Sequence, residues 1–179
     1  MRITADAIKA SVAAYWRYER QCPIVAFESG YNLADVLVLN HENCLIEIEV
    51  KVSLADLRRD KEKPKHRSFR NGMSDQVSFF YFAVPVEIAN TIAQLCDNLY
   101  PYAGVLGTTG TQGSGVQIYR SAKRLSTRTL REDEIRQITR DQSATLCRLA
   151  KKVVELKMDR QLTEERLNSE KRHEQIEKG

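Results

Sequence analysis

The stretch CLIEIEVKVS, residues 44–53, decides the fold because its charged and apolar residues alternate. Successive side chains of a β-strand point to opposite faces, so this alternation predicts a strand with two unlike faces. The even-numbered positions from 46 to 52 are all β-branched, and the opposite face carries Glu47, Glu49 and Lys51. That polar face is either the solvated side of an ordinary strand or the place of a chemical site.

Residues 33–40, LADVLVLN, predict a neighbouring strand that a turn-prone segment connects to the first one. In an antiparallel hairpin, the sequence numbers of two residues that lie opposite each other add up to the same value for every pair. Keeping the even-numbered apolar residues of both strands on one buried face requires an even sum, because a slip of one residue would turn that face to water. A sum of 84 leaves a five-residue connection, 40–44, and places Asp35 opposite Glu49, with Cβ atoms about 5 Å apart.

Two carboxylates this close repel each other, which raises a pKa unless a cation offsets their charge. Lys51 is one such cation. A divalent metal, Mg²⁺ or Mn²⁺, is another, because hard oxygen ligands suit these ions. The alternative is an exposed hairpin on which Asp35, Glu49 and Lys51 form surface ion pairs that contribute little to stability.

The segment that follows the acids is strongly basic. Residues 54–63 predict a short helix that Ser53 caps and Pro64 ends, and residues 64–76 predict a basic loop. Its cations are Arg58, Arg59, Lys61, Lys63, Lys65, Arg67 and Arg70. Phosphodiester hydrolysis needs such a combination, because a basic surface holds the backbone and a metal on the acids polarises the phosphate. The alternative is a solubilising face.

The rest of the chain alternates predicted helices and strands. Residues 3–20 predict a helix, 22–29 a strand, 77–85 a central strand covered on both faces, and 86–97 another helix, while 103–120 suit two short strands around a Gly/Thr-rich turn. The sequence therefore predicts an α/β fold, in which helices flank a mixed central sheet.

From about Arg131 the sequence predicts one long C-terminal helix. Its apolar residues keep a helical spacing at Ile135, Ile138, Leu146, Leu149, Val153 and Leu156. We expect a core at 1–128 and a helical extension at 129–179, whose end projects into solvent or is disordered. The stripe favours packing on the core. A homodimer through this helix is the alternative, because clean heptads are not sustained.

Composition limits the class of protein. The 179 residues, 42% hydrophobic and 29% charged, predict a soluble domain, and no apolar run approaches the roughly 20 residues that span a bilayer. The N-terminus does not resemble a signal peptide. The cysteines have no C-x-x-C spacing, so we expect neither a zinc site nor disulfides, and a cytoplasmic location. The net charge of +4 allows a polyanionic partner.

The motif residues resemble those of the PD-(D/E)XK nuclease superfamily, which has the restriction endonuclease-like fold. They are "AD" at 34–35 and "EVK" at 49–51, within the order helix, three strands, helix, strand. The longer pattern EVKVSLADLRRDKEKPKH…DQVSFFYFAVP, from 49 to 85, is similar to the MmcB-type DNA-repair branch. Asp60, Lys61 and Asp75 occupy similar places there, and the likeness covers most of 25–125.

The resemblance implies a metal-dependent nuclease. Asp35 and Glu49, with the backbone carbonyl of Val50, would bind Mg²⁺ or Mn²⁺, and Lys51 would orient or help deprotonate the attacking water. Two departures from the family pattern are Ala34, where Pro is usual, and the long basic loop after residue 60.

Many members add an acid from the first helix or strand, and here Glu28 is preferred over Glu19. We interpret Glu47 as a residue that supports the site or is merely exposed. The histidines at 41, 66 and 173 have no spacing that suggests a ligand set, so we expect them at the surface, contacting phosphate at most.

The predicted function is therefore that of a Mg²⁺-dependent deoxyribonuclease in DNA repair, recombination or mobile-element and phage DNA processing. Two alternatives stay open. One is a non-catalytic DNA-binding module on the same fold, although such a module has no need to crowd carboxylates near phosphate. The other is an assembly protein organised by the C-terminal helix.

Overall fold

The computed structural model describes residues 3–29, 34–110 and 115–177, with side chains described as far as residue 166. These residues form a mixed six-stranded sheet whose spatial order is the chain order. The strands are β1 (Ile24–Phe27), β2 (Val36–Leu39), β3 (Leu45–Val50), β4 (Val77–Pro85), β5 (Gly104–Thr108) and β6 (Val116–Arg120). The first three form an antiparallel meander, β3, β4 and β5 are parallel, and β6 returns antiparallel to β5.

The predicted register of the first hairpin is confirmed. Val36 lies opposite Ile48 and Val38 opposite Ile46, so the paired numbers sum to 84. The connection between β2 and β3 is the five residues 40–44. Two other predictions fall outside the described part of the chain: the centre of the Gly/Thr-rich turn, residues 111–114, and the side chain of residue 173.

The helices are α1 (Ala5–Ala14), continued by the π-helical segment η1 (Tyr15–Glu19), then α2 (Leu54–Asp60), α3 (Pro64–Arg70), α4 (Val86–Leu99) and α5 (Glu132–Glu177). The predicted Ser53 cap is confirmed, and Thr4 caps α1 in the same way, because each hydroxyl accepts a hydrogen bond from the backbone N–H three residues on, at 3.2 Å.

The prediction of a basic loop after Pro64 is wrong in its first half. Proline has no N–H to lose and a preset φ at the first position of a helix, so Pro64 opens α3 instead of ending the preceding helix. The helix before it, α2, already ends at Asp60. The cations of this segment are consequently distributed over two short helices and the turn between them.

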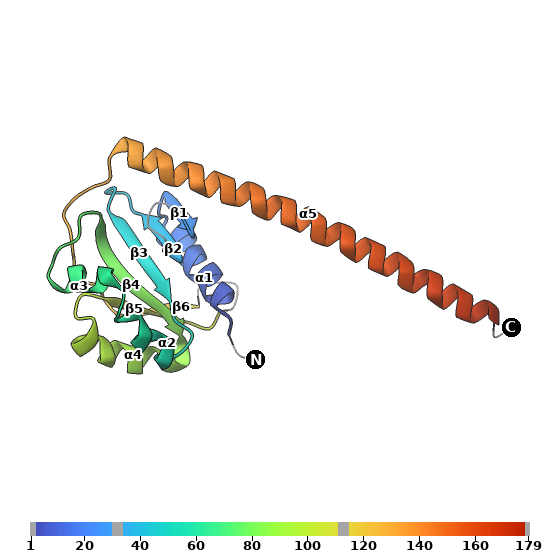
Figure 1. Cartoon of the computed structure of the whole chain (residues 1–179), viewed down its shortest axis with the longest axis horizontal. Coiled ribbons are helices and arrows are strands. Elements are labelled where there is room, and N and C mark those ends of the chain that lie inside the picture. The colour runs from blue at the N-terminus through green and yellow to red at the C-terminus, as the bar shows by residue number, and fades with distance from the viewer. Residues whose placement is uncertain (1–2, 30–33, 111–114, 178–179) are drawn as a thin grey trace. The chain divides into compact units, whose positions relative to one another are not determined.

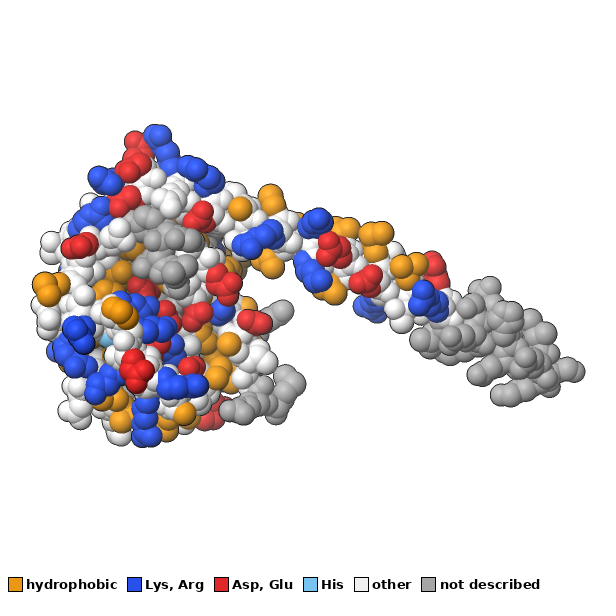
Figure 2. Space-filling view, in the orientation of Figure 1, with side chains coloured by type: hydrophobic (Ala, Val, Ile, Leu, Met, Phe, Trp, Pro, Cys, Tyr) orange, Lys and Arg blue, Asp and Glu red, His pale blue; other side chains and the backbone are white. Residues whose placement is uncertain are grey.

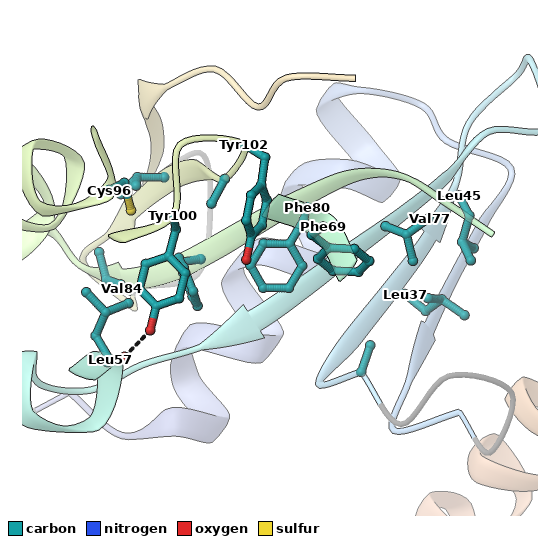
Figure 3. Close-up of a cluster of buried hydrophobic side chains, with 14 of the residues drawn as sticks. Leu37, Leu45, Leu57, Phe69, Val77, Phe80, Val84, Cys96, Tyr100 and Tyr102 are labelled. Atoms are coloured by element: carbon teal, nitrogen blue, oxygen red, sulfur yellow. Dashed lines mark hydrogen bonds between the residues drawn. The ribbon is translucent and has the colours of Figure 1, made fainter. Parts of the chain in front are cut away.

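Two apolar clusters form the core, one on each face of the sheet. Figure 1 shows the helices that cover these faces, with α1 on one side of the sheet and α3 and α4 on the other. On one face α1 contributes Ile8 and Val12, which pack with the even-numbered residues of β2 and β3. On the other face α2, α3, α4 and the first turns of α5 contribute side chains such as Leu57, Phe69 and Ile92. Figure 3 shows this second cluster, with Tyr100 and Tyr102 standing beside the phenylalanines of β4 and α3.

The interpretation of β3 as a strand with a solvated side is wrong. Glu47, Glu49 and Lys51 are 0%, 4% and 5% exposed. Their face of the sheet is the one covered by α2 and α3, and the neighbouring strand β2 is buried on both faces as well. The charged residues of β3 therefore lie inside the fold and need partners there.

The chain divides into two compact units, Met1–Gln142 and Ser143–Gly179, so the division falls later than residue 128. In the first unit the beginning of α5 is anchored by the buried Ile138 and by a hydrogen bond from the Ser29 hydroxyl to Asp141 at 2.9 Å. The second unit is helical. Its residues Leu146, Leu149, Val153 and Leu156 are about half exposed or more.

The described helices include none that is both long and apolar enough to cross a membrane. All four cysteines are free thiols, and Cys147 is the exposed one.

Candidate functional site

A cluster of six charged side chains lies beneath α2 and α3, at the C-terminal half of β3. We call it the buried charge cluster. It consists of three carboxylates and three ammonium groups: Glu47, Glu49, Asp60, Lys51, Lys63 and Lys65. Three negative and three positive charges balance one another, which is what burial in a low-dielectric environment requires.

Glu49 is the centre of this cluster. Its Oε2 accepts hydrogen bonds from Lys51 at 3.2 Å and from Lys63 at 3.1 Å, and its Oε1 lies 2.5 Å from the Lys65 ammonium. Burial by itself raises the pKa of Glu49. The three ammonium groups outweigh that effect, the charge of Lys65 most strongly, so the pKa lies below its usual range.

Lys65 joins the two glutamates of β3. Its ammonium contacts both Glu47 and Glu49 and lies 5.5 Å from the centre of the Phe80 ring. Burial lowers the pKa of Lys65, but the two carboxylates raise it above its usual value on balance. Glu47 is therefore an internal partner of α3, and of the two roles expected for it, that of an exposed residue is wrong.

Asp60, the last residue of α2, has hydrogen-bond partners on both oxygens of its carboxylate. Its Oδ1 accepts from Lys51 at 2.8 Å and from Lys63 at 2.7 Å, and its Oδ2 lies 2.6 Å from Nε2 of His66. Burial raises the pKa of Asp60, but the hydrogen bonds from His66, Lys51 and Lys63 outweigh it and hold the pKa below the usual range.

His66 is buried rather than at the surface, which corrects the expectation from the sequence. Its Nδ1 lies 2.6 Å from the hydroxyl of Tyr102, and its ring packs edge-on against Phe80 and Tyr100. Burial raises the pKa of Tyr102 above its usual range, so this phenol keeps its proton. The sequence did not predict the contacts of His66 with Asp60 and Tyr102, because the residues of α3 were expected to form a loop.

Asp35 contacts the end of β3 through the backbone and pairs with a lysine outside the buried charge cluster. Its Oδ2 accepts a hydrogen bond from the backbone N–H of Val50 at 2.8 Å, and its Oδ1 lies 3.1 Å from the ammonium of Lys9 on α1. Lys9 also pairs with Glu28 at 2.6 Å. The hairpin therefore brings Asp35 to the Glu49–Val50 strand end, while its ion pair is with Lys9, a residue that the sequence did not single out.

The two other candidate acids lie farther out. Glu28 is 69% exposed and takes part in the site through Lys9, with a backbone φ of 44° that is uncommon for this residue type. Glu19 is exposed at the end of η1.

The donors suit a hard divalent cation in kind. Asp35 and Glu49 offer carboxylate oxygens at neighbouring strand ends, and Mg²⁺ in proteins is bound through one or two carboxylates, with water or phosphate oxygens completing the octahedron. Within the part of the chain that the structure describes, no three His, Cys, Asp or Glu side chains group as metal ligands.

The predicted DNA-binding cations separate into two groups. Arg58, Arg59, Lys61, Arg67 and Arg70 are exposed. Lys63 and Lys65, with side chains 46% and 25% exposed, point into the charge cluster. Figure 2 shows Lys and Arg side chains gathered in the part of the view where Figure 1 places α2, α3 and α4, with single acidic side chains among them.

Beside the cluster, a polar cavity of about 580 Å³ opens between α3 and the start of β4. Glu47 and Lys65 line its inner wall, and the exposed Asp75 lies at its rim. Of the two buried glutamates of β3, Glu47 therefore borders a hollow that is large enough for a ligand group.

No family model and no curated protein matches this sequence. Among solved structures, the chain is similar to the SPO1766 protein of unknown function from Silicibacter pomeroyi, with a TM-score of 0.57 and 16% sequence identity. The match covers 86% of this chain and 93% of that one. At this identity the likeness supports the α/β fold alone.

Proposed function

We propose that this chain is a Mg²⁺-dependent deoxyribonuclease of the PD-(D/E)XK kind, with Asp35, Glu49 and Lys51 as its central residues. One observation carries the proposal. Glu49 and Lys51 leave the same end of β3 in direct contact, at 3.2 Å, and the confirmed register brings Asp35 to the same strand end through its bond to Val50.

Each residue has a role that follows from its chemistry. The carboxylates of Asp35 and Glu49 and the carbonyl of Val50 would hold Mg²⁺ or Mn²⁺, which supplies positive charge to polarise the scissile phosphate. Lys51 presents an ammonium donor beside Glu49. There it orients the attacking water or a phosphate oxygen by hydrogen bonding and offsets the negative charge that develops in the transition state.

The exposed cations of α2 and α3 supply the DNA-binding surface. Arg58, Arg59 and Lys61 lie within one turn of Asp60 along the chain, so phosphates bound to them are held near the cluster. Lys63, half exposed and bonded to both Glu49 and Asp60, lies between the basic surface and the buried acids. A role in DNA repair, recombination or mobile-element processing follows from the resemblance in sequence and is part of the same proposal.

The test is incubation of the purified chain with single-stranded, nicked, branched and linear duplex DNA, in Mg²⁺, Mn²⁺ or EDTA. We expect cleavage of at least one substrate with Mg²⁺ or Mn²⁺ and none with EDTA. Glu49→Gln, which keeps the shape of the side chain and removes its charge, should abolish cleavage.

The matched control is Glu155→Gln, because Glu155-x-Lys157 repeats the acid-x-lysine spacing on the exposed helix α5. This variant should cut as the wild type does. Equal cleavage by the Glu49 variant would contradict the assignment. DNA binding with no cleavage of any substrate would favour the non-catalytic DNA-binding module, and absence of both would favour the assembly protein.

A further inference from the structure

We infer that Asp60 and His66 are positioning residues that hold the Lys51 ammonium in place; the inference rests on the proposed nuclease function and extends it. The relevant contacts form one continuous chain. Lys51 donates to Asp60 at 2.8 Å, Asp60 meets His66 at 2.6 Å, and His66 meets Tyr102 at 2.6 Å. All four side chains are at least nine-tenths buried.

Lys51 needs an anchor beyond Glu49. A lysine side chain has a flexible four-carbon stem, and fixing it costs conformational entropy. One carboxylate two residues away on the same strand does not define where the ammonium lies. Asp60 approaches from α2 and closes the position from a second direction, so the ammonium sits between two carboxylates, 3.2 Å from Glu49 and 2.8 Å from Asp60.

Asp60 is itself an unfavourable residue at this place. It is the last residue of α2, where the helix dipole disfavours a negative charge, and it is buried. Apolar packing would serve the stability of such a site as well as a buried ionic network does. The carboxylate is tolerated because Lys51, Lys63 and His66 together occupy both of its oxygens.

His66 fixes the orientation of that carboxylate. Its Nε2 donates to Oδ2 of Asp60, which leaves Oδ1 facing the two lysines. The Tyr102 hydroxyl meets the other ring nitrogen, and the rings of Phe80, Phe82 and Tyr100 pack around the imidazole. The imidazole is thus immobile, and a hydrogen-bond network held in this way specifies one geometry at its far end.

The test compares variants that keep the packing but differ in hydrogen bonding. His66→Gln can still donate to Asp60, whereas His66→Phe cannot. Asp60→Asn keeps the shape and removes the charge. We expect kcat for DNA cleavage to fall about 100-fold in His66→Phe and Asp60→Asn, because misplacing a reacting group has that effect. His66→Gln should stay within about fivefold of wild type, since one retained hydrogen bond restores most of the position.

Two further readouts separate positioning from damage to the fold or to DNA binding. Affinity for duplex DNA in EDTA should be the same in all variants. Pulse acetylation with acetic anhydride, read by peptide mass spectrometry, reports how firmly Lys51 is held. Labelling of Lys51 should rise about tenfold in His66→Phe and in Asp60→Asn, because that factor corresponds to the loss of one charged hydrogen bond. Labelling of Lys9, which is mostly buried on the other face of the sheet, should not change.

Equal kcat and equal Lys51 labelling in the Gln and Phe variants would overturn the inference, as would wild-type behaviour of Asp60→Asn. A parallel rise of labelling at Lys9 would assign the effect to unfolding and also overturn it. Tyr102→Phe, which removes only the outer hydroxyl, gives a smaller change of the same sign if the inference holds. If the wild type cuts no DNA, the proposed function fails, and the labelling pattern still decides whether Asp60 and His66 hold Lys51.

Discussion

The ammonium of Lys63 lies 2.7 Å from Asp60 and 3.1 Å from Glu49, so one half-exposed side chain bridges two buried carboxylates. Lys51 makes the same two contacts from inside the fold. The acids at the end of β3 and α2 are therefore neutralised from two sides. The inner lysine is fixed by burial, while the outer one can exchange its partners with solvent or with a bound phosphate.

Lys65 and Lys63 also differ in exposure, with side chains 25% and 46% exposed, and this difference predicts unequal effects on stability when each lysine is replaced. Lys65→Met should lower the free energy of unfolding by about 2–4 kcal/mol, because it leaves two buried glutamates with one ammonium fewer each. Lys63→Met should cost about 1 kcal/mol, because its charge is screened by solvent. Urea unfolding at pH 7 measures both, with the exposed Lys61→Met as control. A Lys63 variant that is less stable than the Lys65 variant would contradict this ranking.

The stability of the chain should depend on Asp60 at acid pH. The pKa of Asp60 is lowered in the folded state, so its contribution is fully present above the ordinary aspartate pKa of about 3.9 and is lost as pH falls through the lower folded value. We expect the urea midpoint, measured in EDTA, to fall steeply below about pH 4. Asp60→Asn should be less stable at pH 7 and should show a shallower fall; parallel curves for the two proteins would refute the assignment.

DNA binding should depend on salt in proportion to the cations that contact phosphate. Removing the charges of Arg58 and Arg59 by substitution with Gln should reduce the slope of log affinity against log salt by about 2. Fluorescence anisotropy with labelled duplex DNA in EDTA measures this slope. Substituting Arg148 and Lys151, exposed cations of the second unit, should leave it unchanged. The same loss in both variants would mean that net charge alone governs binding.

The register of the β2–β3 hairpin was predictable because side-chain alternation has a period of two, and parity admits few alternatives. That one constraint brought Asp35 to the end of β3, where its carboxylate accepts a hydrogen bond from the backbone N–H of Val50. The burial of the polar face was not predicted, because two of the cations that neutralise it, Lys63 and Lys65, come from the α2–α3 segment, whose approach no strand pattern encodes. One signal was available: Leu37 and Leu39 alternate onto the same face as Glu47, which indicates that this face is covered.

The contact between Asp60 and His66 shows a second limit of prediction from the sequence. Reading Pro64 as the end of a helix turned residues 64–76 into a loop, in which a histidine is expected at the surface. Proline is equally favourable as the first residue of a helix, and the local sequence does not separate these roles. The choice is settled by packing, since Phe69 and His66 lie one turn apart on α3 and both face the aromatic residues of β4.

The exposed apolar residues of α5 predict weak self-association. Leu146, Leu149, Val153 and Leu156 follow a three–four–three spacing and are largely exposed, and burying them against a second copy of the helix removes apolar surface from water. Arg160 and Thr163 take the next two positions of this pattern, so the seam is short and the dimer should dissociate on dilution. Light scattering over a range of protein concentrations measures this. Leu149→Glu with Val153→Glu should give a monomer throughout, and a wild-type chain that stays monomeric at high concentration would contradict the prediction.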